Sequence, residues 1–246
     1  MTNSSININA DVGEGFNNEA DLMPYLSSCN IACGGHAGNK LTMKSVVQLA
    51  KKCNVKIGAH PSFPDKINFG RLPMDISFEE LRASLSTQIQ TLNEIARQEK
   101  VKLYHIKPHG SLYNLAAKDE KIASIIIDII KTDFEDLKLY APYKSVIANL
   151  AKSNKIEVVF EAFADRNYNE DLSLVSRQNK DAILTKKEHV FNHIFNMIKH
   201  EKVKTKSGVE VPIKATTFCV HSDTKNVTEI LSYLALKLKE NKIEIQ

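Results

Sequence analysis

The sequence has few of the features that mark secretion or insertion into a membrane. Its longest apolar run, from Ile122 to Ile130, is interrupted by Ser124 and Asp128 and is far shorter than the ~20 residues that a membrane span needs. Residues 2–9 alternate polar and apolar side chains, and they lack the basic start and apolar core of a signal peptide. We therefore expect a cytoplasmic protein with no membrane partner.

Cysteine is scarce, and its spacing excludes a disulfide framework. The chain has 4 cysteines and no C-x-x-C pair; they are Cys29, Cys33, Cys53 and Cys219. Cys29, Cys33 and Cys219 lie in apolar segments, where small buried thiols are the usual occupants. A catalytic or metal-binding thiolate is the alternative.

Three common ligand-binding motifs are missing. There is no G-x-x-x-x-G-K-[ST] loop and no G-x-G-x-x-G fingerprint, so ATP, if it is used, is held in some other way. There is no H-E-x-x-H metal motif either. His189 and His193 are four residues apart, but they fall opposite the apolar face of their helix, so we expect both to be exposed to solvent. The formal charge of +4 is spread over the chain without a basic stripe, which argues against nucleic-acid binding.

No Pro-rich or Gly-rich linker divides the chain, which has only 9 glycines and 7 prolines. The length of 246 residues, with 43% hydrophobic and 25% charged residues, suits one globular domain with a sizeable core. We therefore assign residues 1–246 to a single domain.

Short β-like runs alternate with amphipathic helical patterns from end to end. The expected strands are Ile6–Ala10, Cys29–Cys33, Val55–Ala59, Lys102–Ile106, Leu137–Tyr140, Glu157–Ala162 and Thr217–Val220. Ser77 with Glu80, and Thr185 with Glu188, predict two capping boxes, and Asn39 and Thr224 predict two further helix N-caps. Repeated strand–helix units indicate a parallel sheet, most simply closed as an incomplete, seven-stranded β/α barrel of the TIM type. An open, doubly wound sheet is the alternative.

Polar residues follow nearly every expected strand. They are Asp11 and Glu14 after the first, His36 after the second, His60 after the third, Lys107 and His109 after the fourth, Glu161, Asp165 and Arg166 after the sixth, and His221 and Asp223 after the seventh. In a parallel barrel these strand ends open onto one face, which is where such enzymes place their active sites. Glycines around Glu14 and His36, and prolines after His60 and Lys107, predict pre-shaped loops.

Two chemistries fit this set of residues. Asp11, His36 and His60 are able to bind zinc or another divalent metal and leave a position for water. Alternatively, carboxylates and imidazoles transfer protons while Lys107 and Arg166 stabilise negative charge. The spacing does not decide between them.

Six segments, in order along the chain, resemble the LamB/YcsF family. They read NADVGE at 9–14, NIACGGHAG at 30–38, IGAHPSFPD at 57–65, FGR at 69–71, KPHGSLYN at 107–114 and EAFADRNY at 161–168. Two positions depart from the family pattern: Ala10 replaces a usual Cys, and Ser222 replaces a usual Gly, where it is expected to crowd a tight loop. The segment 177–181 also follows the family pattern only loosely.

The resemblance implies a seven-stranded barrel related to the glycoside hydrolase and deacetylase fold. It also implies the A component of a 5-oxoprolinase, which opens 5-oxoproline to L-glutamate with ATP and Mg²⁺ and works with separate B and C subunits. We expect catalytic roles for Asp11, Glu14, His36, His60, Lys107 and His109, and substrate-binding roles for Asp65, Arg71, Tyr113, Asn114, Glu161, Asp165, Arg166, His221 and Asp223. A stand-alone metal-dependent deacetylase or amide hydrolase, and a non-catalytic subunit that binds a small acid, remain the alternatives.

Overall fold

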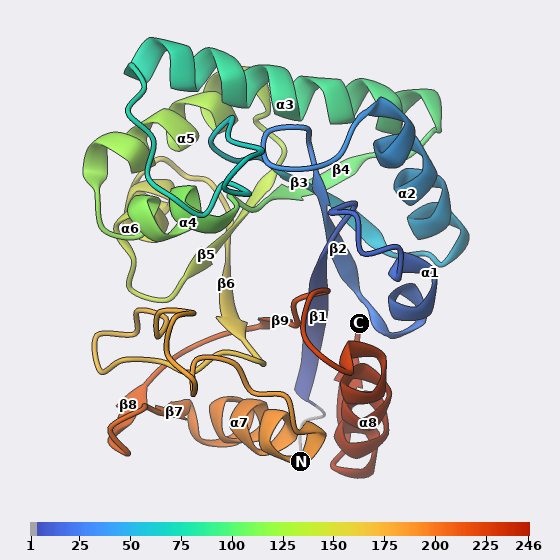
Figure 1. Cartoon of the computed structure of the whole chain (residues 1–246), viewed down its shortest axis with the longest axis vertical. Helices are drawn as coiled ribbons and strands as arrows, with labels where there is room; N and C mark the ends of the chain where they lie inside the picture. Colours follow the sequence, from blue (N-terminus) through green and yellow to red (C-terminus); the bar gives the residue numbers. More distant parts are fainter. Residues whose placement is uncertain (1–3) are drawn as a thin grey trace.

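The computed structural model describes residues 4–246, and seven parallel strands form its centre (Figure 1). They are β1 Ser4–Val12, β2 Ser28–Ala32, β3 Lys56–His60, β4 Leu103–Ile106, β5 Lys138–Pro142, β6 Val158–Phe163 and β9 Thr217–Cys219. Each pairs with the next in this order, and β9 pairs with β1 as well as with β6. The sheet therefore closes into the expected seven-stranded barrel, and the open sheet is excluded.

Three further strands, each three residues long, were not predicted. The hairpin of β7 Lys202–Lys204 and β8 Glu210–Pro212 is antiparallel and stands apart from the barrel. The last strand, β10 Ile243–Ile245, pairs with Ser4–Ile6 of β1. The carboxyl end of the chain is thereby held against the start of the first barrel strand.

Helices cover the outside of the barrel. They are α1 Glu19–Leu22, α2 Lys40–Lys52, α3 Phe78–Gln98, α4 Gly110–Ala116, α5 Glu120–Asp133, α6 Val146–Ser153, α7 Lys187–His200 and α8 Val227–Glu240, with a short 3-10 helix, η1, at Met23–Tyr25. Figure 1 shows the long α3 along one side of the strands and α7 and α8 on the opposite side. The buried faces of these helices and the outward faces of the strands form the apolar core.

Two of the predicted helix starts are confirmed. The Ser77 hydroxyl accepts a hydrogen bond from the Glu80 amide at 3.2 Å, and the Glu80 carboxylate accepts one from the Ser77 amide at 3.2 Å. The Asn39 side chain accepts hydrogen bonds from the amides of Leu41 and Thr42. Both devices satisfy amides that the first turn of a helix leaves without partners.

Two other predicted caps are wrong. Helix α7 begins at Lys187 with Lys186 as its N-cap, and no side chain caps it, so Thr185 lies outside the helix. Helix α8 begins after Asn226, again without a side-chain cap. Thr224 instead donates its hydroxyl proton to Asp165 at 2.6 Å. Thr224, which the sequence suggested as a helix N-cap, therefore holds the Asp165 carboxylate near the strand ends.

The inside of the barrel is polar, which the sequence pattern did not predict. Asn9 donates hydrogen bonds to Glu161 and Thr217, and Asn30 donates one to Asn9. His105 lies 2.6 Å from the Asn30 side-chain oxygen. A side chain at Gly58 would collide with the His105 ring, so glycine is required on that strand. Alternating strand residues put these groups inside and their apolar neighbours outside.

The burial of individual side chains tests the predictions for the cysteines and for two histidines. Cys29, Cys33 and Cys219 are buried, as predicted, and Cys53 is half-buried; all four thiols are free. His189 is exposed, as predicted. The prediction for His193 is wrong, because its ring is half-buried and stacks on Tyr168. Over residues 4–246, no helix is long and apolar enough to cross a membrane.

Candidate functional site

A cavity of about 540 Å³ opens at the carboxyl ends of the barrel strands. Its lining is mainly charged and polar; among others it includes Asp11, Glu14, His60, Arg71, Lys107, His109, Ser111, Tyr113, Asn114, Phe163, Arg166, Arg177, His221 and Asp223. The volume is in the range of sites for small molecules. The barrel therefore brings most of the predicted site residues to one place.

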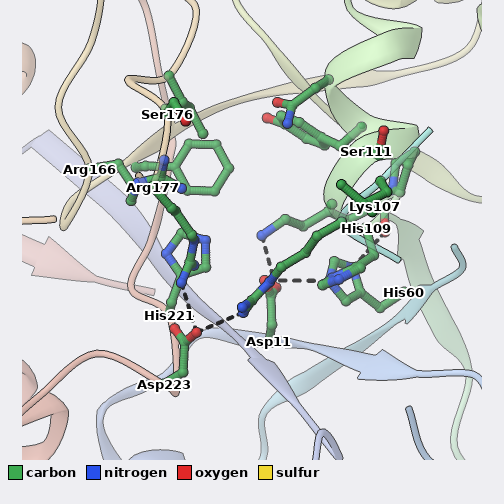
Figure 2. Close-up of a pocket in the computed structure, with 18 of the residues that line it drawn as sticks. Asp11, His60, Lys107, His109, Ser111, Arg166, Ser176, Arg177, His221 and Asp223 are labelled. Carbon is green, nitrogen blue, oxygen red and sulfur yellow. Dashed lines mark hydrogen bonds and ion pairs between the residues drawn. The ribbon is translucent and has the colours of Figure 1, made fainter. Parts of the chain in front are cut away.

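Asp11 lies at the centre of the lining, between Lys107 and His60 (Figure 2). Its Oδ1 accepts hydrogen bonds from the Lys107 ammonium at 2.9 Å and from the Asn30 amide at 2.8 Å. Its Oδ2 lies 3.4 Å from His60 Nε2. Burial alone would raise the pKa of Asp11, but the charges of His60 and Lys107 outweigh burial and hold the pKa well below its usual value. Asp11 is therefore a carboxylate at neutral pH.

Lys107 is nearly inaccessible, with 2% of its surface exposed. Besides Asp11, its ammonium lies 3.0 Å from Glu161 Oε1 and 3.1 Å from the Cys219 sulfur. Burial favours the neutral amine, yet Asp11 and the other anionic neighbours raise the pKa of Lys107 well above its usual value. An ammonium has three donors, and these contacts use all three. Lys107 thus fixes two carboxylates in position and keeps a positive charge beneath the cavity.

Glu14 and three histidines form a second group, beside Asp11. His36 Nε2 lies 2.8 Å from Glu14 Oε1, His109 Nδ1 lies 2.9 Å from His60 Nε2, and His109 Nδ1 lies 3.4 Å from Glu14 Oε1. One ligand atom from each of the four lies within 4.8 Å of the others. Asp11 falls in a different group, with Cys219 and His221. The structure thus places His36 against Glu14, and it places His60 between Asp11, 3.4 Å away, and His109, 2.9 Å away.

Burial decides the charge of two of these histidines. Burial lowers the pKa of His36, although the hydrogen bond to Glu14 acts in the opposite direction. Burial and the neighbouring His36 and His60 lower the pKa of His109 well below its usual value. Both rings are therefore neutral at pH 7, and each presents a lone pair on one nitrogen.

Tight loops hold these rings in place. Gly70 has a φ of +61°, and a Cβ at this position would meet the side chains of His109 and His36 at 3.1 Å. The Ser111 amide donates to the Gly70 carbonyl at 2.9 Å, and His109 Nε2 lies 2.9 Å from the Phe69 carbonyl. The FGR segment therefore has two roles: its backbone packs directly against two of the histidine rings, and its arginine lines the cavity.

Two arginines line the other side of the cavity. Arg71 Nη2 and Arg177 Nη1 both lie 2.8 Å from Asp223 Oδ2. Figure 2 shows Arg177, from the segment after β6, beside His221 and on the same side of the cavity as Asp223. Sequence reasoning missed Arg177, because it lies in a long irregular loop and not at a strand end. The only feature of the sequence that could have indicated Arg177 was that its loop follows a strand rich in site residues.

Asp165 and Arg166 hold the residues and the loop that form part of the cavity wall. Asp165 accepts a hydrogen bond from the His221 amide, and its Oδ1 lies 2.9 Å from His221 Nδ1. The Arg166 guanidinium donates to the carbonyls of Val175 and Ala182, so it fixes the loop that carries Arg177.

The departure from the family pattern at Ser222 does not distort its loop. Ser222 is buried, and its backbone is outside the positive-φ region. The expected crowding is therefore wrong, because the loop accommodates the serine without requiring glycine.

Four of the predicted residues do not line the cavity. His36 and Glu161 lie behind the residues that do, and Asp165 is covered by His221. Asp65 lies farther away, where its carboxylate accepts hydrogen bonds from the backbone and side chain of Asn68. Asp65 therefore stabilises a surface turn, and the prediction that it contacts a ligand in this cavity is not supported by its position.

The sequence is similar to curated proteins over nearly its whole length. It is 40% identical over 245 residues to the A component of the 5-oxoprolinase from Clostridium beijerinckii, a match that covers 98% of this chain and 96% of the relative. The crystal structure of a lactam utilization protein from Thermus thermophilus superposes with a TM-score of 0.91 at 32% identity, covering 98% of this chain and 99% of that one.

A more distant likeness concerns the fold alone. A peptidoglycan deacetylase from Bacillus subtilis matches with a TM-score of 0.51 at 11% identity, covering 99% of this chain and 87% of that chain. This agrees with the expected relation to the deacetylase fold. Residues 6–246 match the LamB/YcsF family. Taken with the 40% identity to a curated relative, this match shows that the chain belongs to the LamB/YcsF family.

Proposed function

We propose that this chain is the A component of a 5-oxoprolinase, which converts 5-oxo-L-proline to L-glutamate while ATP is hydrolysed to ADP and phosphate. The observation that carries the proposal is one cavity in which paired arginines face a buried carboxylate and imidazoles. The name of the relative from Clostridium beijerinckii supports the assignment. The cavity also has room for more than a single small acid, as an activated substrate requires.

In this proposal the carboxylate of 5-oxoproline binds the arginine side of the cavity. Arg71 and Arg177 share a single partner, Asp223, so each guanidinium keeps donors for a ligand. Arginine is well suited to a carboxylate, because its planar donors make two parallel hydrogen bonds. Binding there places the lactam ring toward Asp11 and His60.

An unactivated five-membered lactam resists attack by water, so ATP is proposed to phosphorylate its carbonyl oxygen. Water then attacks C5, the bond from C5 to nitrogen breaks, and the nitrogen takes a proton, which leaves a glutamyl phosphate. A second water displaces the phosphate and gives glutamate. Asp11 orients the first water and receives its proton through Oδ2. Lys107 and Asn30 hold only Oδ1, so they do not occupy the oxygen that faces the water. The Lys107 charge offsets the negative charge that develops above it.

The partners proposed are the B and C subunits of the enzyme, since relatives carry the name of one component of a larger enzyme. The test is glutamate formation from 5-oxoproline with ATP and Mg²⁺, using this chain and candidate B and C subunits together, and leaving out each in turn. We expect full activity from the complete set and little or none from the chain alone. Glutamate formation without this chain would refute the function, and full turnover by the chain alone would refute the partner requirement.

A further inference from the structure

His221 and Asp165 form a pair at the edge of the cavity. Asp165 follows β6 and His221 follows β9, and these two strands are neighbours in the barrel. His221 Nδ1 lies 2.9 Å from Asp165 Oδ1, and the His221 amide donates to Asp165 Oδ2 at 2.9 Å. The Phe163 ring stacks on the imidazole, with 5.2 Å between the ring centroids and 11° between the planes. These contacts hold the His221 ring in one orientation.

The contact with Asp165 fixes which nitrogen of His221 always bears a proton. Burial would raise the pKa of Asp165, but the charge of His221 and the hydrogen bonds from His221 and Thr224 hold the pKa below its usual value. Asp165 is therefore a carboxylate at neutral pH, and a carboxylate only accepts hydrogen bonds. Nδ1 must then donate to Asp165. Nε2 is left as the nitrogen that gains and loses a proton.

The Nε2 atom of His221 opens onto the cavity, near the groups that bind and attack the substrate. It is accessible and has no hydrogen-bond partner among residues 4–246, and the His221 side chain lines the cavity. A ring nitrogen of His221 lies within 4.8 Å of an Asp11 carboxylate oxygen, a separation that one water molecule is able to bridge. Figure 2 shows Arg177 beside the same ring.

The other basic and phenolic side chains of the cavity are poor donors of a proton to the substrate. Lys107 is held by three protein partners, and arginine does not give up its proton. Burial lowers the pKa of His109 well below its usual value, and burial raises the pKa of Tyr113 well above its usual value. Both ring nitrogens of His60 lie within 2.9 Å of protein atoms. His221 is the side chain of this kind that keeps a free nitrogen.

We propose that His221 is a further catalytic residue, which gives the proton on Nε2 to the nitrogen of the opening lactam. This role rests on the function proposed above, in which water attacks C5 and Asp11 takes a proton from that water. The bond from C5 to nitrogen breaks, its electron pair stays on the nitrogen, and the proton from Nε2 binds to that pair. Asp11 passes the proton that it received to Nε2, so neither side chain gains or loses a proton over the cycle.

The chemical need for such a group is clear. Without a proton the leaving nitrogen would depart as an amide anion, which is a far stronger base than a carboxylate or an imidazole. A positioned acid removes this barrier, and histidine is the residue that most often does so. Asp165 orients the ring and stabilises the charge that Nε2 acquires when it takes up a proton.

The test compares variants of this chain in the assembled enzyme, by glutamate release from 5-oxoproline with ATP and Mg²⁺. His221→Ala should lower kcat by ~10²-fold or more and change KM much less. Imidazole added to the buffer should raise the rate of this variant, because it enters the space that the ring leaves and carries the proton. A histidine that only supported the fold would not be replaced in this way.

One further variant and a control make the test specific. His221→Gln keeps a polar side chain but is unable to carry a proton, so its kcat should fall as far as that of His221→Ala. His189→Ala, which changes an exposed histidine on α7, should keep the unaltered kcat with or without imidazole. If His221→Ala does not fold, His221→Gln decides alone.

An unaltered kcat in His221→Gln, or a loss confined to KM, would overturn the role of His221. If the assembled enzyme without substitutions releases no glutamate, the proposed function itself is refuted, and this role with it.

Discussion

At the scale of single residues, the two sides of the cavity have different tasks. Asp11 is surrounded by groups that hold it charged, since Lys107 and Asn30 both donate to its Oδ1. Arg177 is only half-buried and has one carboxylate partner, Asp223. A fixed, buried anion suits a chemical step, and a less restrained cation suits binding of an anionic substrate.

Arg177→Ala should therefore affect binding more than chemistry. We expect KM for 5-oxoproline to rise ~10-fold or more in the assembled enzyme, because a charge-assisted hydrogen bond contributes about 1.5–3 kcal/mol. The value of kcat should change much less. Steady-state kinetics give both constants, and Arg97→Ala, on the exposed face of α3, is the matched control. An unchanged KM for the Arg177 variant would remove Arg177 from the binding site.

The sequence predicted residues of the site where they directly follow a strand. Asp11, His60 and Lys107 lie within one residue of a strand end, so their position followed from the barrel. Arg177 could not be found in this way, because a long loop determines its place. The polar interior residues Asn9, Asn30 and His105 were missed for another reason. A strand with one polar face is usually read as having a solvent-exposed face, and here that face is the inside of the barrel.

At the scale of helices and strands, the two capping patterns around Ser77 and Thr185 look alike in sequence but differ in structure. Ser77 caps α3, whereas Thr185 lies before the start of α7. Ser77→Ala should lower the free energy of unfolding by about 1 kcal/mol. Thr185→Ala should change it by less than ~0.5 kcal/mol, as for an ordinary surface position. Urea denaturation of both variants measures the difference, and equal losses would contradict the assigned helix starts.

The local sequence does not show why Ser77 caps its helix and Thr185 does not. A Ser or Thr followed by Glu three residues later is able to cap a helix only if the chain enters the first turn at that residue. In α7 the preceding segment is held by Arg166, which donates to the Ala182 carbonyl, and the helix then begins at Lys187. Tertiary contacts of the loop thus override the local signal.

His193, on α7, should make stability depend on pH. Burial lowers the pKa of His193 to about 4, although a backbone hydrogen bond at Arg166 acts against it. The unfolded chain has the usual histidine pKa of ~6.5, so it binds the proton first as the pH falls. The contribution of His193 to stability is therefore complete above pH ~6.5 and is lost as the pH falls toward about 4.

The variant His193→Phe removes this titration and keeps a ring that stacks on Tyr168. Its unfolding free energy should fall less between pH ~6.5 and about 4 than that of the unaltered chain. Denaturation curves at several pH values provide the comparison, and His189→Phe, at an exposed position of the same helix, is the control. Parallel pH profiles for His193→Phe and the unaltered chain would show that the ring titrates normally.

At the scale of the whole molecule, barrel closure unites residues that are far apart in the chain. Pairing of β9 with β1 places His221 and Asp223 beside Asp11, and the loop after β6 places Arg177 over the same cavity. We therefore propose that the assembled enzyme opens 5-oxoproline in this cavity, with Asp11 acting on the attacking water.

The most direct measurement of this role is the rate at which the assembled enzyme, carrying Asp11→Asn in this chain, releases glutamate from 5-oxoproline with ATP and Mg²⁺. The substitution keeps the size of the side chain and removes the carboxylate that is proposed to receive a proton. We predict a rate lower by ~10²-fold or more, with circular dichroism showing an unaltered fold. Glutamate release at the unaltered rate by a folded Asp11→Asn enzyme would contradict this role for Asp11.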